Sequence, residues 1–148
     1  MNVRKCKYED ILAVSELEKE CFKGESWSFG IIASAFENPA YAMLVAEEDG
    51  EIIGYGCTCT AVDTCDLENV LVAEEYRHSG VGTAILNALI SDAKDRGVEK
   101  MFLEVRVSNS AALKLYLACG FVGVYARTRY YSDGEDCLVM QKVICASK

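Results

Sequence analysis

The chain has 148 residues, 51% of them hydrophobic, and a formal net charge of −8 at pH 7. This length suits a single domain over residues 1–148 with its own hydrophobic core, and it leaves no room for a second domain. The acidic balance argues against a nucleic-acid-binding surface, since contacts to phosphate need a basic face, and it favours a cationic substrate or partner.

The composition also predicts the compartment and the state of the cysteines. No stretch approaches the roughly 20 consecutive apolar residues that span a bilayer, and the residues after Met1 lack the apolar run of a secretory signal. We therefore expect a cytoplasmic protein without membrane contact. The eight cysteines include no Cys-x-x-Cys pair, and His78 is the one histidine. Reduced thiols are expected, with neither a disulfide framework nor a metal site.

The first half of the chain alternates between strand and helix patterns. Three-to-four spacing of apolar residues marks helices, and β-branched or alternating runs mark strands. The Asp49-Gly50 dipeptide favours a tight hairpin between two of these strands. The predicted elements are a strand at residues 3–6, a helix at 11–21, a second helix at 29–36 and strands at 41–46 and 52–60.

The second half continues the alternation. Gly97 and Gly120 are suited to closing helices, and Ser108 or Asn109 can cap the start of one. The predicted elements are a strand at residues 65–72, a helix from 81 to about 96, a strand at 98–105, a helix from about 110 to 119, and strands at 121–131 and 137–144. This order predicts an α/β fold in which helices cover a central mixed sheet.

A glycine-containing loop joins one predicted strand to the strongest predicted helix. It reads Glu75-Tyr76-Arg77-His78-Ser79-Gly80-Val81-Gly82-Thr83. Backbone N–H groups at a helix start are unpaired and can hold phosphate, and glycines let a phosphate approach closely. The alternative is a loop that merely turns the chain. The loop is neither a Walker loop nor a dinucleotide fingerprint, because it lacks the Gly-Lys-Ser/Thr run and the third glycine.

Arg77-x-x-Gly80-x-Gly82, after a strand that ends in Val70-Leu71-Val72, resembles the pyrophosphate loop of GNAT acetyltransferases. The order of elements is similar to that family's over essentially the whole chain. The resemblance implies the GNAT fold, with acetyl-CoA as co-substrate in a splayed gap between the two central parallel strands. It implies that backbone groups of Val70, Leu71 and Val72 face the pantetheine arm. The implied pyrophosphate loop is Arg77, His78, Ser79, Gly80, Val81, Gly82 and Thr83, where His78 either contacts phosphate or lies in solvent.

Glu104 interrupts an otherwise apolar predicted strand near its C-terminal end. Strand alternation puts Phe102, Glu104 and Arg106 on one face. Taken alone, Glu104 reads as a solvated residue or as the partner of Arg106. Functional groups also favour such strand ends, so both interpretations stay open at this level.

Two longer patterns are similar to the RimI-type ribosomal-protein-alanine N-acetyltransferases within the GNAT family. They are Leu103-Glu104-Val105-Arg106-x-Ser108-Asn109 and Leu115-Tyr116-x-x-x-Gly120-Phe121. This resemblance implies Glu104 as general base, directly or through water, Tyr116 as general acid toward the coenzyme A thiolate, and Asn109 as a cofactor contact. The N–H of Leu71 or Val72 would stabilise the oxyanion. Tyr116 also reads as a core aromatic, and Asn109 as a helix N-cap.

Residues 127–136 bear on the identity of the acceptor, because they resemble the final hairpin of protein N-terminal acetyltransferases. In those families this hairpin and the segment between the first two helices, here residues 25–28, border the peptide groove. The resemblance implies a protein N-terminal α-amine as acceptor, with the N-terminal alanine of a ribosomal protein expected. An α-amine has a pKa near ~8 against ~10.4 for lysine, which eases its deprotonation. The alternatives are a small-molecule amine acceptor and a non-catalytic acyl-CoA-binding module.

Overall fold

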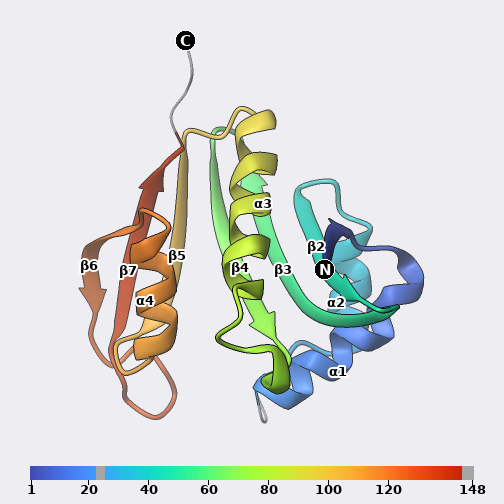
Figure 1. Cartoon of the computed structure of the whole chain (residues 1–148). Coiled ribbons are helices and arrows are strands. Elements are labelled where there is room, and N and C mark those ends of the chain that lie inside the picture. The colour runs from blue at the N-terminus through green and yellow to red at the C-terminus, as the bar shows by residue number, and fades with distance from the viewer. Residues whose placement is uncertain (23–25, 145–148) are drawn as a thin grey trace.

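A computed structural model describes residues 1–22 and 26–144. In this part of the chain, seven strands form one sheet in the order β1-β2-β3-β4-β5-β7-β6 (Figure 1). Every neighbouring pair is antiparallel except the central pair β4 and β5. The strands are β1 (Asn2–Lys5), β2 (Tyr41–Glu48), β3 (Glu51–Ala61), β4 (Thr64–Val72), β5 (Lys100–Arg106), β6 (Val122–Arg127) and β7 (Cys137–Val143).

Helices cover both faces of this sheet. Helices α1 and α2 pack on one face, and α3 and α4 lie on the other (Figure 1). The predicted α/β class, the mixed sheet and the order of elements are confirmed. The helical segments are the 3-10 turns η1 (Tyr8–Asp10) and η2 (Glu74–Tyr76) and the helices α1 (Ile11–Cys21), α2 (Phe29–Phe36), α3 (Val81–Asp95) and α4 (Ser110–Ala118).

One predicted strand ends earlier than its composition suggested. Residues 121–131 read as one continuous strand, but β6 stops at Arg127. Arg129 has a φ of 49°, in the left-handed region, which ends an extended strand. Residues 128–136 therefore form a loop between β6 and β7, and this loop contributes to the site described below.

Each face of the sheet has its own hydrophobic core. The first lies under α3, whose buried side chains are those of one helical stripe, Val81, Ile85, Leu86, Leu89 and Ala93. The second lies under α1 and α2 and includes Ile11, Val14, Leu17, Ile32 and Tyr55. The sheet separates the two cores. Any opening between its strands therefore connects one face of the sheet with the other.

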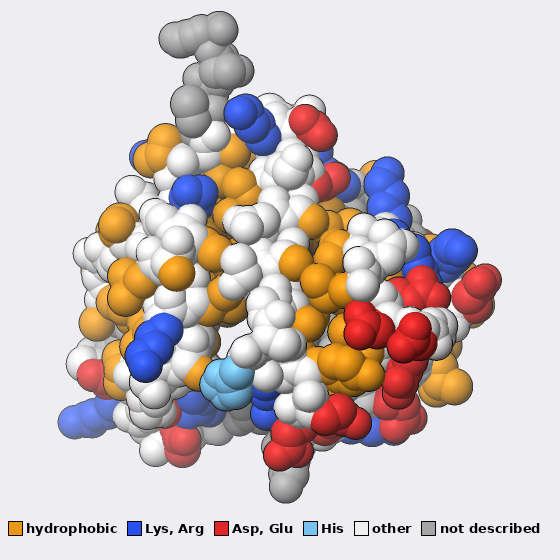
Figure 2. All heavy atoms as spheres, in the orientation of Figure 1, with side chains coloured by type: hydrophobic (Ala, Val, Ile, Leu, Met, Phe, Trp, Pro, Cys, Tyr) orange, Lys and Arg blue, Asp and Glu red, His pale blue; other side chains and the backbone are white. Residues whose placement is uncertain are grey.

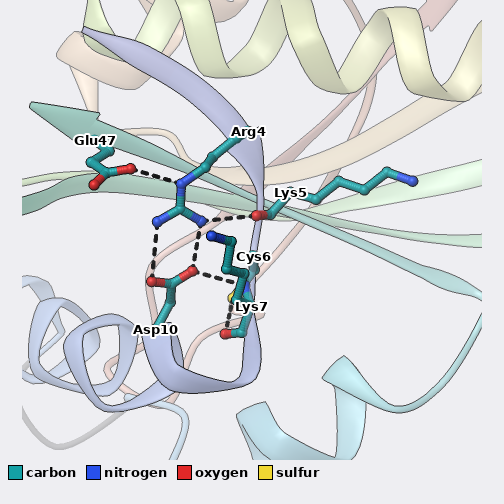
Figure 3. A network of polar contacts seen from close by, with 6 residues as sticks. All are labelled: Arg4, Lys5, Cys6, Lys7, Asp10 and Glu47. Carbon is teal, nitrogen blue, oxygen red and sulfur yellow. Dashed lines mark hydrogen bonds and ion pairs between the residues drawn. The ribbon is translucent and has the colours of Figure 1, made fainter. Parts of the chain in front are cut away.

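A polar network joins the first strand to the start of α1 (Figure 3). The Arg4 guanidinium donates 2.8 and 3.2 Å hydrogen bonds to the Asp10 carboxylate, and its Nε donates a 2.8 Å bond to Glu47 on β2. Asp10 also accepts a 2.8 Å bond from the Lys7 backbone N–H. The Arg4 hydrogen bonds hold the pKa of Asp10 below its ordinary value. This network anchors the entry of α1 to the sheet.

Strands β4 and β5 pair only at their beginnings. Thr64–Asp66 pair with Lys100–Phe102, and beyond these residues the two strands diverge. A bulge explains the divergence: Cys57 of β3 faces Asn69, while Thr58 faces Leu67, so Glu68 is an extra residue on β4. Because of the bulge, Val70 and Val72 pack toward α3 and Leu71 packs toward α1. The predicted gap between the central parallel strands is therefore built by a bulge.

Two further features concern membranes and thiols. None of the helices in residues 1–22 and 26–144 is both long enough and apolar enough to cross a membrane. The seven cysteines of the described residues are free thiols, four of them buried. Cys145 lies outside the described residues.

Candidate active site

A cavity of about 600 Å³ opens where β4 and β5 diverge. Its walls include Glu104 from the α1 and α2 face of the sheet and Ala112 and Tyr116 from α4 on the opposite face. Figure 2 shows the α3 and α4 face hollowed between α4 and the start of α3. The cavity thus reaches the sheet from both sides, which allows two substrates to meet between the strands.

Glu104 lies on β5 with its side chain 40% exposed. Alternation along β5 buries Leu103 and Val105 under α4 and turns Glu104 to the other face, as the sequence predicted. Its carboxylate accepts a 2.8 Å hydrogen bond from the Tyr130 hydroxyl and lies 3.4 Å from the Arg127 Nε. Both partners belong to the β6 to β7 region, so the final hairpin holds Glu104 in position.

Arg106 fastens the loop between β6 and β7 over the end of β5. Its guanidinium makes 2.9 and 3.0 Å contacts with Asp133 and Glu135 and lies 4.1 Å from the centre of the Tyr131 ring. Glu135 also accepts a 2.8 Å hydrogen bond from the Ser108 backbone N–H. The loop that carries Tyr130 is therefore tied to β5 and to the turn that follows it.

Tyr116 enters the cavity from α4, on the other side of the sheet from Glu104. Its ring packs edge-on against Phe121, with the ring centres 5.9 Å apart. The hydroxyl has no hydrogen-bond partner in the part of the chain that the structure describes. Burial raises the pKa of Tyr116 to about 12, so its hydroxyl stays protonated. Tyr116 thus combines a packed ring with a hydroxyl that is available as a proton donor.

Asn109 precedes α4 and also lines the cavity. Its side-chain oxygen accepts a 3.1 Å hydrogen bond from the Ala112 N–H, which is the N-cap geometry considered from the sequence. The amide NH2 of Asn109 has no partner among the described residues. The capping role is therefore present, and the donor group remains for a ligand.

The loop before α3 has the backbone of an anion site. His78 and Gly80 both have positive φ angles, 63° and 90°, and the first helical hydrogen bond is made by the Ala84 N–H to the Gly80 carbonyl. The N–H groups of Val81, Gly82 and Thr83 therefore start the helix without carbonyl partners. None of these three residues lines the cavity, and a Cβ at Gly82 would lie 4.0 Å from Val70 of the cavity wall.

Two loop side chains are turned back onto the chain. The Arg77 guanidinium donates a 2.9 Å hydrogen bond to the Val72 carbonyl and lies 3.4 Å from the Cys21 sulfur. The Ser79 hydroxyl donates to the Tyr76 carbonyl. Both contacts shape the loop, so the backbone N–H groups, more than these side chains, face outward for a phosphate.

The β4 backbone beyond the bulge has free groups in the gap. The Ala73 N–H donates to the Ile53 carbonyl at 2.8 Å, which makes these two residues a hydrogen-bonded pair with β3. Since antiparallel pairs alternate, the Leu71 N–H faces β3, and the N–H groups of Val70 and Val72 face the gap. Between the two predicted oxyanion donors, this alternation favours Val72 over Leu71.

Sequence reasoning missed a buried carboxylate beside the bulge. Glu18 of α1 is 1% exposed and accepts a 3.0 Å hydrogen bond from the Trp27 N–H and a 2.7 Å bond from the Asn69 side-chain amide. Burial raises its pKa. Glu18 therefore links α1, the predicted groove segment and the bulge. Glu25, which was expected to border the groove, lies outside the described residues.

The acidic residues Asp66 and Glu68 of β4 were also missed as cavity residues. Both line the cavity on the Glu104 side. Both residues are exposed to the open cavity. Partial desolvation there, followed by the negative charge of Glu104, raises the pKa of Asp66. Partial desolvation, followed by the charges of Asp66 and Glu104, raises the pKa of Glu68. Period-two alternation alone would have treated both as ordinary solvated strand residues.

Comparison with known proteins gives consistent matches. The sequence model described as "Acetyltransferase (GNAT) family" matches residues 11–121. A ribosomal protein bS18-alanine N-acetyltransferase of Escherichia coli (strain K12) is 35% identical over 117 residues, covering 77% of this chain and 78% of the relative. An N-alpha-acetyltransferase of Sulfurisphaera tokodaii is 32% identical over 151 residues, covering 93% and 90%.

Solved structures match over nearly the full length. The ribosomal-protein-S18-alanine N-acetyltransferase from Escherichia coli superposes with a TM-score of 0.89 at 30% identity, covering 99% of this chain and 96% of the other. The Salmonella typhimurium protein yncA, solved with its cofactor acetyl-CoA, superposes with a TM-score of 0.88 over 100% of this chain and 96% of its own. At 20% identity, the second match concerns the fold alone.

Proposed function

Because the chain belongs to the acetyltransferase (GNAT) family, we propose that it transfers the acetyl group of acetyl-CoA to the α-amine at a protein N-terminus. The expected acceptor is the N-terminal alanine of a ribosomal protein, which is the substrate class in the names of the Escherichia coli relatives. The chain acts as one catalytic domain, and its net charge of −8 suits a cationic acceptor.

The observation that carries this proposal is the position of Glu104 and Tyr116 on opposite sides of one cavity through the sheet. Glu104 accepts a proton from the acceptor's ammonium group, directly or through a water molecule. Tyr116 donates its proton to the sulfur as the carbon–sulfur bond breaks and the carbon–nitrogen bond forms. The second amine proton leaves to solvent. The Val72 N–H, which faces the gap, hydrogen-bonds the carbonyl oxygen as negative charge develops on it.

The residues present fit acetyl-CoA as the acyl donor. Free N–H groups at the start of α3 suit the pyrophosphate, because that helix end also carries the positive end of the helix dipole. The outward N–H of Val70 offers the pantetheine arm a strand-like hydrogen bond where β5 has moved away, and the N–H of Val72 is left for the thioester oxygen. Asn109 supplies a donor at the far wall. Acetyl-CoA provides the activated acetyl group, and the chain positions it.

A panel assay tests the proposal. Purified protein is incubated with acetyl-CoA and with N-terminal peptides, lysine peptides and polyamines, and mass spectrometry locates the acetyl group. We expect acetylation at the α-amine of peptides with a small first residue. Modification of polyamines or lysine side chains in preference to α-amines would favour the small-amine alternative. Binding of acetyl-CoA without transfer to any acceptor would favour a non-catalytic module.

A further inference from the structure

The acceptor side of the cavity holds two carboxylates that the proposed chemistry does not use. Asp66 and Glu68 follow the short stretch where β4 and β5 are paired, and Glu68 is the extra residue of the β4 bulge. Their side chains point to the same face as Glu104, because Leu67 and Leu103 between them are buried on the other face. The three carboxylates therefore line the same part of the cavity wall.

Asp66 and Glu68 have no hydrogen-bond or ion-pair partner among the described residues. Glu104 is engaged by Tyr130 and Arg127, but no side chain in residues 1–22 and 26–144 makes a hydrogen bond or ion pair with Asp66 or Glu68. The charged neighbours that shift their pKa are all negative, and the shifts are upward. The like charges of Asp66, Glu68 and Glu104 repel one another, and the Arg127 ion pair is made by Glu104, so the charge of Glu68 does not stabilise the folded chain.

Other groups on the cavity wall point to a ligand at this place. Across the sheet, Tyr116 lines the same cavity, and its hydroxyl has no hydrogen-bond partner among the described residues. The N–H groups of Val70 and Val72, two and four residues beyond Glu68, also face the gap without a β5 partner. The acyl carbon is expected between these donors. An amine that attacks it from the α1 and α2 face must pass the carboxylate at the bulge.

We propose that Glu68 binds the ammonium group of the acceptor at the bulge of β4, opposite Glu104, and thereby selects cationic amines for this site. Asp66, two residues before Glu68 on β4, adds to the negative potential at the end of the gap where β4 and β5 are paired. Glu68 holds the amine, and Glu104, steadied by Tyr130, takes its proton. This inference rests on the proposed function, since it assigns the acceptor to that same cavity. It adds a binding residue and the charge of the group that binds.

The titratable and charged groups that face Glu68 come from several elements. Negative charge comes from β4 and β5, and thiol and phenol groups come from the neighbouring strands. Guanidinium groups lie elsewhere on the cavity wall. The groups that interact electrostatically with Glu68 are Asp66, Glu104, Cys57 and Tyr41. The other titratable or cationic groups of the cavity wall include Tyr125, Tyr131, Arg106 and Arg127.

The test compares binding of an amine with binding of its uncharged counterpart. The best N-terminal peptide from the panel and the same peptide without its α-amine are titrated by calorimetry into protein saturated with coenzyme A, so that no transfer occurs. A hydrogen bond to a charged group corresponds to about 10- to 100-fold in affinity. We expect wild-type protein to bind the amine peptide tighter by that factor, and Glu68→Gln to lose most of the preference.

Control variants separate the binding role from chemistry and from folding. Glu99→Gln makes the same change at an exposed carboxylate just before β5, outside the cavity, and should behave as wild type. Asp66→Asn should lose a smaller part of the preference. With acetyl-CoA, Glu68→Gln should raise KM about 10-fold or more and leave kcat within about three-fold. The reason is that the lost contact stabilises the bound substrate and the transition state equally. The melting temperature of Glu68→Gln should equal or exceed that of wild type.

Two results would overturn the inference. One is an unchanged preference for the amine peptide in folded Glu68→Gln. The other is a fall in kcat at constant KM, which would make Glu68 part of the chemistry. A failure of the proposed function looks different, because wild-type protein would then acetylate no peptide α-amine in the panel.

Discussion

The Tyr130 hydroxyl donates a 2.8 Å hydrogen bond to Oε1 of Glu104, which joins the loop after β6 to the middle of β5. This hydrogen bond and the negative charge of Glu104 raise the pKa of Tyr130, so the phenol remains a donor. The same carboxylate lies 3.4 Å from the Arg127 Nε through its other oxygen. Glu104 is thus oriented by two residues that are 23 and 26 positions away in sequence.

Glu104→Gln should lower kcat while leaving acetyl-CoA affinity close to that of wild type. The amide keeps the shape and can still accept the Tyr130 hydrogen bond, but it cannot take a proton. Positioned bases typically contribute ~100- to 10,000-fold in rate, and the deficit should be larger at low pH, where more of the amine is protonated. Steady-state kinetics from pH 6 to about 10, the upper pKa range of amines, measure this. Full kcat across that range would make Glu104 a structural carboxylate, and Glu99→Gln serves as the matched control.

Tyr116→Phe should lower kcat by less than Glu104→Gln does. The change removes only the hydroxyl, which has no partner among the described residues, so the packing against Phe121 persists. A coenzyme A thiolate leaves without full protonation, so a loss of about 10- to 100-fold, at the low end for an acid catalyst, is expected. Kinetics together with thermal melting measure it. A large loss of stability at unchanged kcat would show that the hydroxyl serves folding instead.

Gly82→Asp should nearly abolish acetyl-CoA binding. A Cβ at residue 82 meets Leu115 at 3.5 Å and Val72 at 3.8 Å, which are ordinary contacts, so the helix accepts a side chain there. The added carboxylate, however, would lie at the helix start that is proposed to hold the pyrophosphate. Gly82→Ala adds bulk without charge and should keep most of the affinity. Calorimetry with acetyl-CoA compares the two, and equal affinities in folded variants would place the phosphates elsewhere.

Glu18→Ala should lower the free energy of unfolding by about 3 kcal/mol, because the Trp27 and Asn69 donors each lose an acceptor at about 1–3 kcal/mol. Glu18→Gln should lose much less, since its oxygen still serves Trp27 and the Asn69 amide can turn to accept a bond. Urea unfolding measures both variants. Equal losses for the two would mean that the charge, rather than the hydrogen bonds, holds this region together.

Glu18 makes the stability of the folded chain depend on pH. Its pKa is raised in the folded chain, so above the unfolded value of about 4.3 the folded chain binds more protons than the unfolded chain. Stability therefore falls as pH rises from that value through the raised pKa. Because glutamine does not titrate, the free energy of unfolding of Glu18→Gln should rise relative to that of wild type as pH increases through this range. Unfolding measured at several pH values detects the gain.

Asp10→Asn should lower the free energy of unfolding at pH 7 by about 1–3 kcal/mol, because it breaks the charge-assisted bonds from Arg4. The pKa of Asp10 is lowered in the folded chain. Its contribution is thus present above the unfolded value of about 3.9 and is lost as pH falls through the folded value. Urea unfolding at pH 7 and at a pH below the folded-state pKa of Asp10 measures this. The difference in unfolding free energy between wild type and Asp10→Asn should be smaller at the lower pH. A difference that is the same at both pH values would contradict the ionic origin, and Asp63→Asn is the exposed control.

The local patterns of the chain determined the order of its elements and part of its site. The stripe that includes Val81, Ile85 and Leu89 predicts α3, and Gly80 and Gly82 at its start predict an anion loop, because helix periodicity and glycine conformation are local properties. Glu104 was recognisable because a single carboxylate in an apolar strand stands out against period-two alternation. Its catalytic role and that of Tyr116 came from the family resemblance, and both remain predictions.

Only the tertiary structure decided where the sheet opens and which carboxylates meet there. The bulge at Glu68 arises because its neighbours Leu67 and Asn69 pair with two consecutive residues of β3, and no local pattern in β4 specifies that pairing. Glu18 looks like any helical glutamate until α1 packs on the sheet and buries it. The Tyr130 and Arg127 contacts to Glu104 require β6 and β7 to return beside β5. Burial, charge repulsion and strand pairing between distant segments are properties of the folded chain, and a linear pattern of residue types carries them only indirectly.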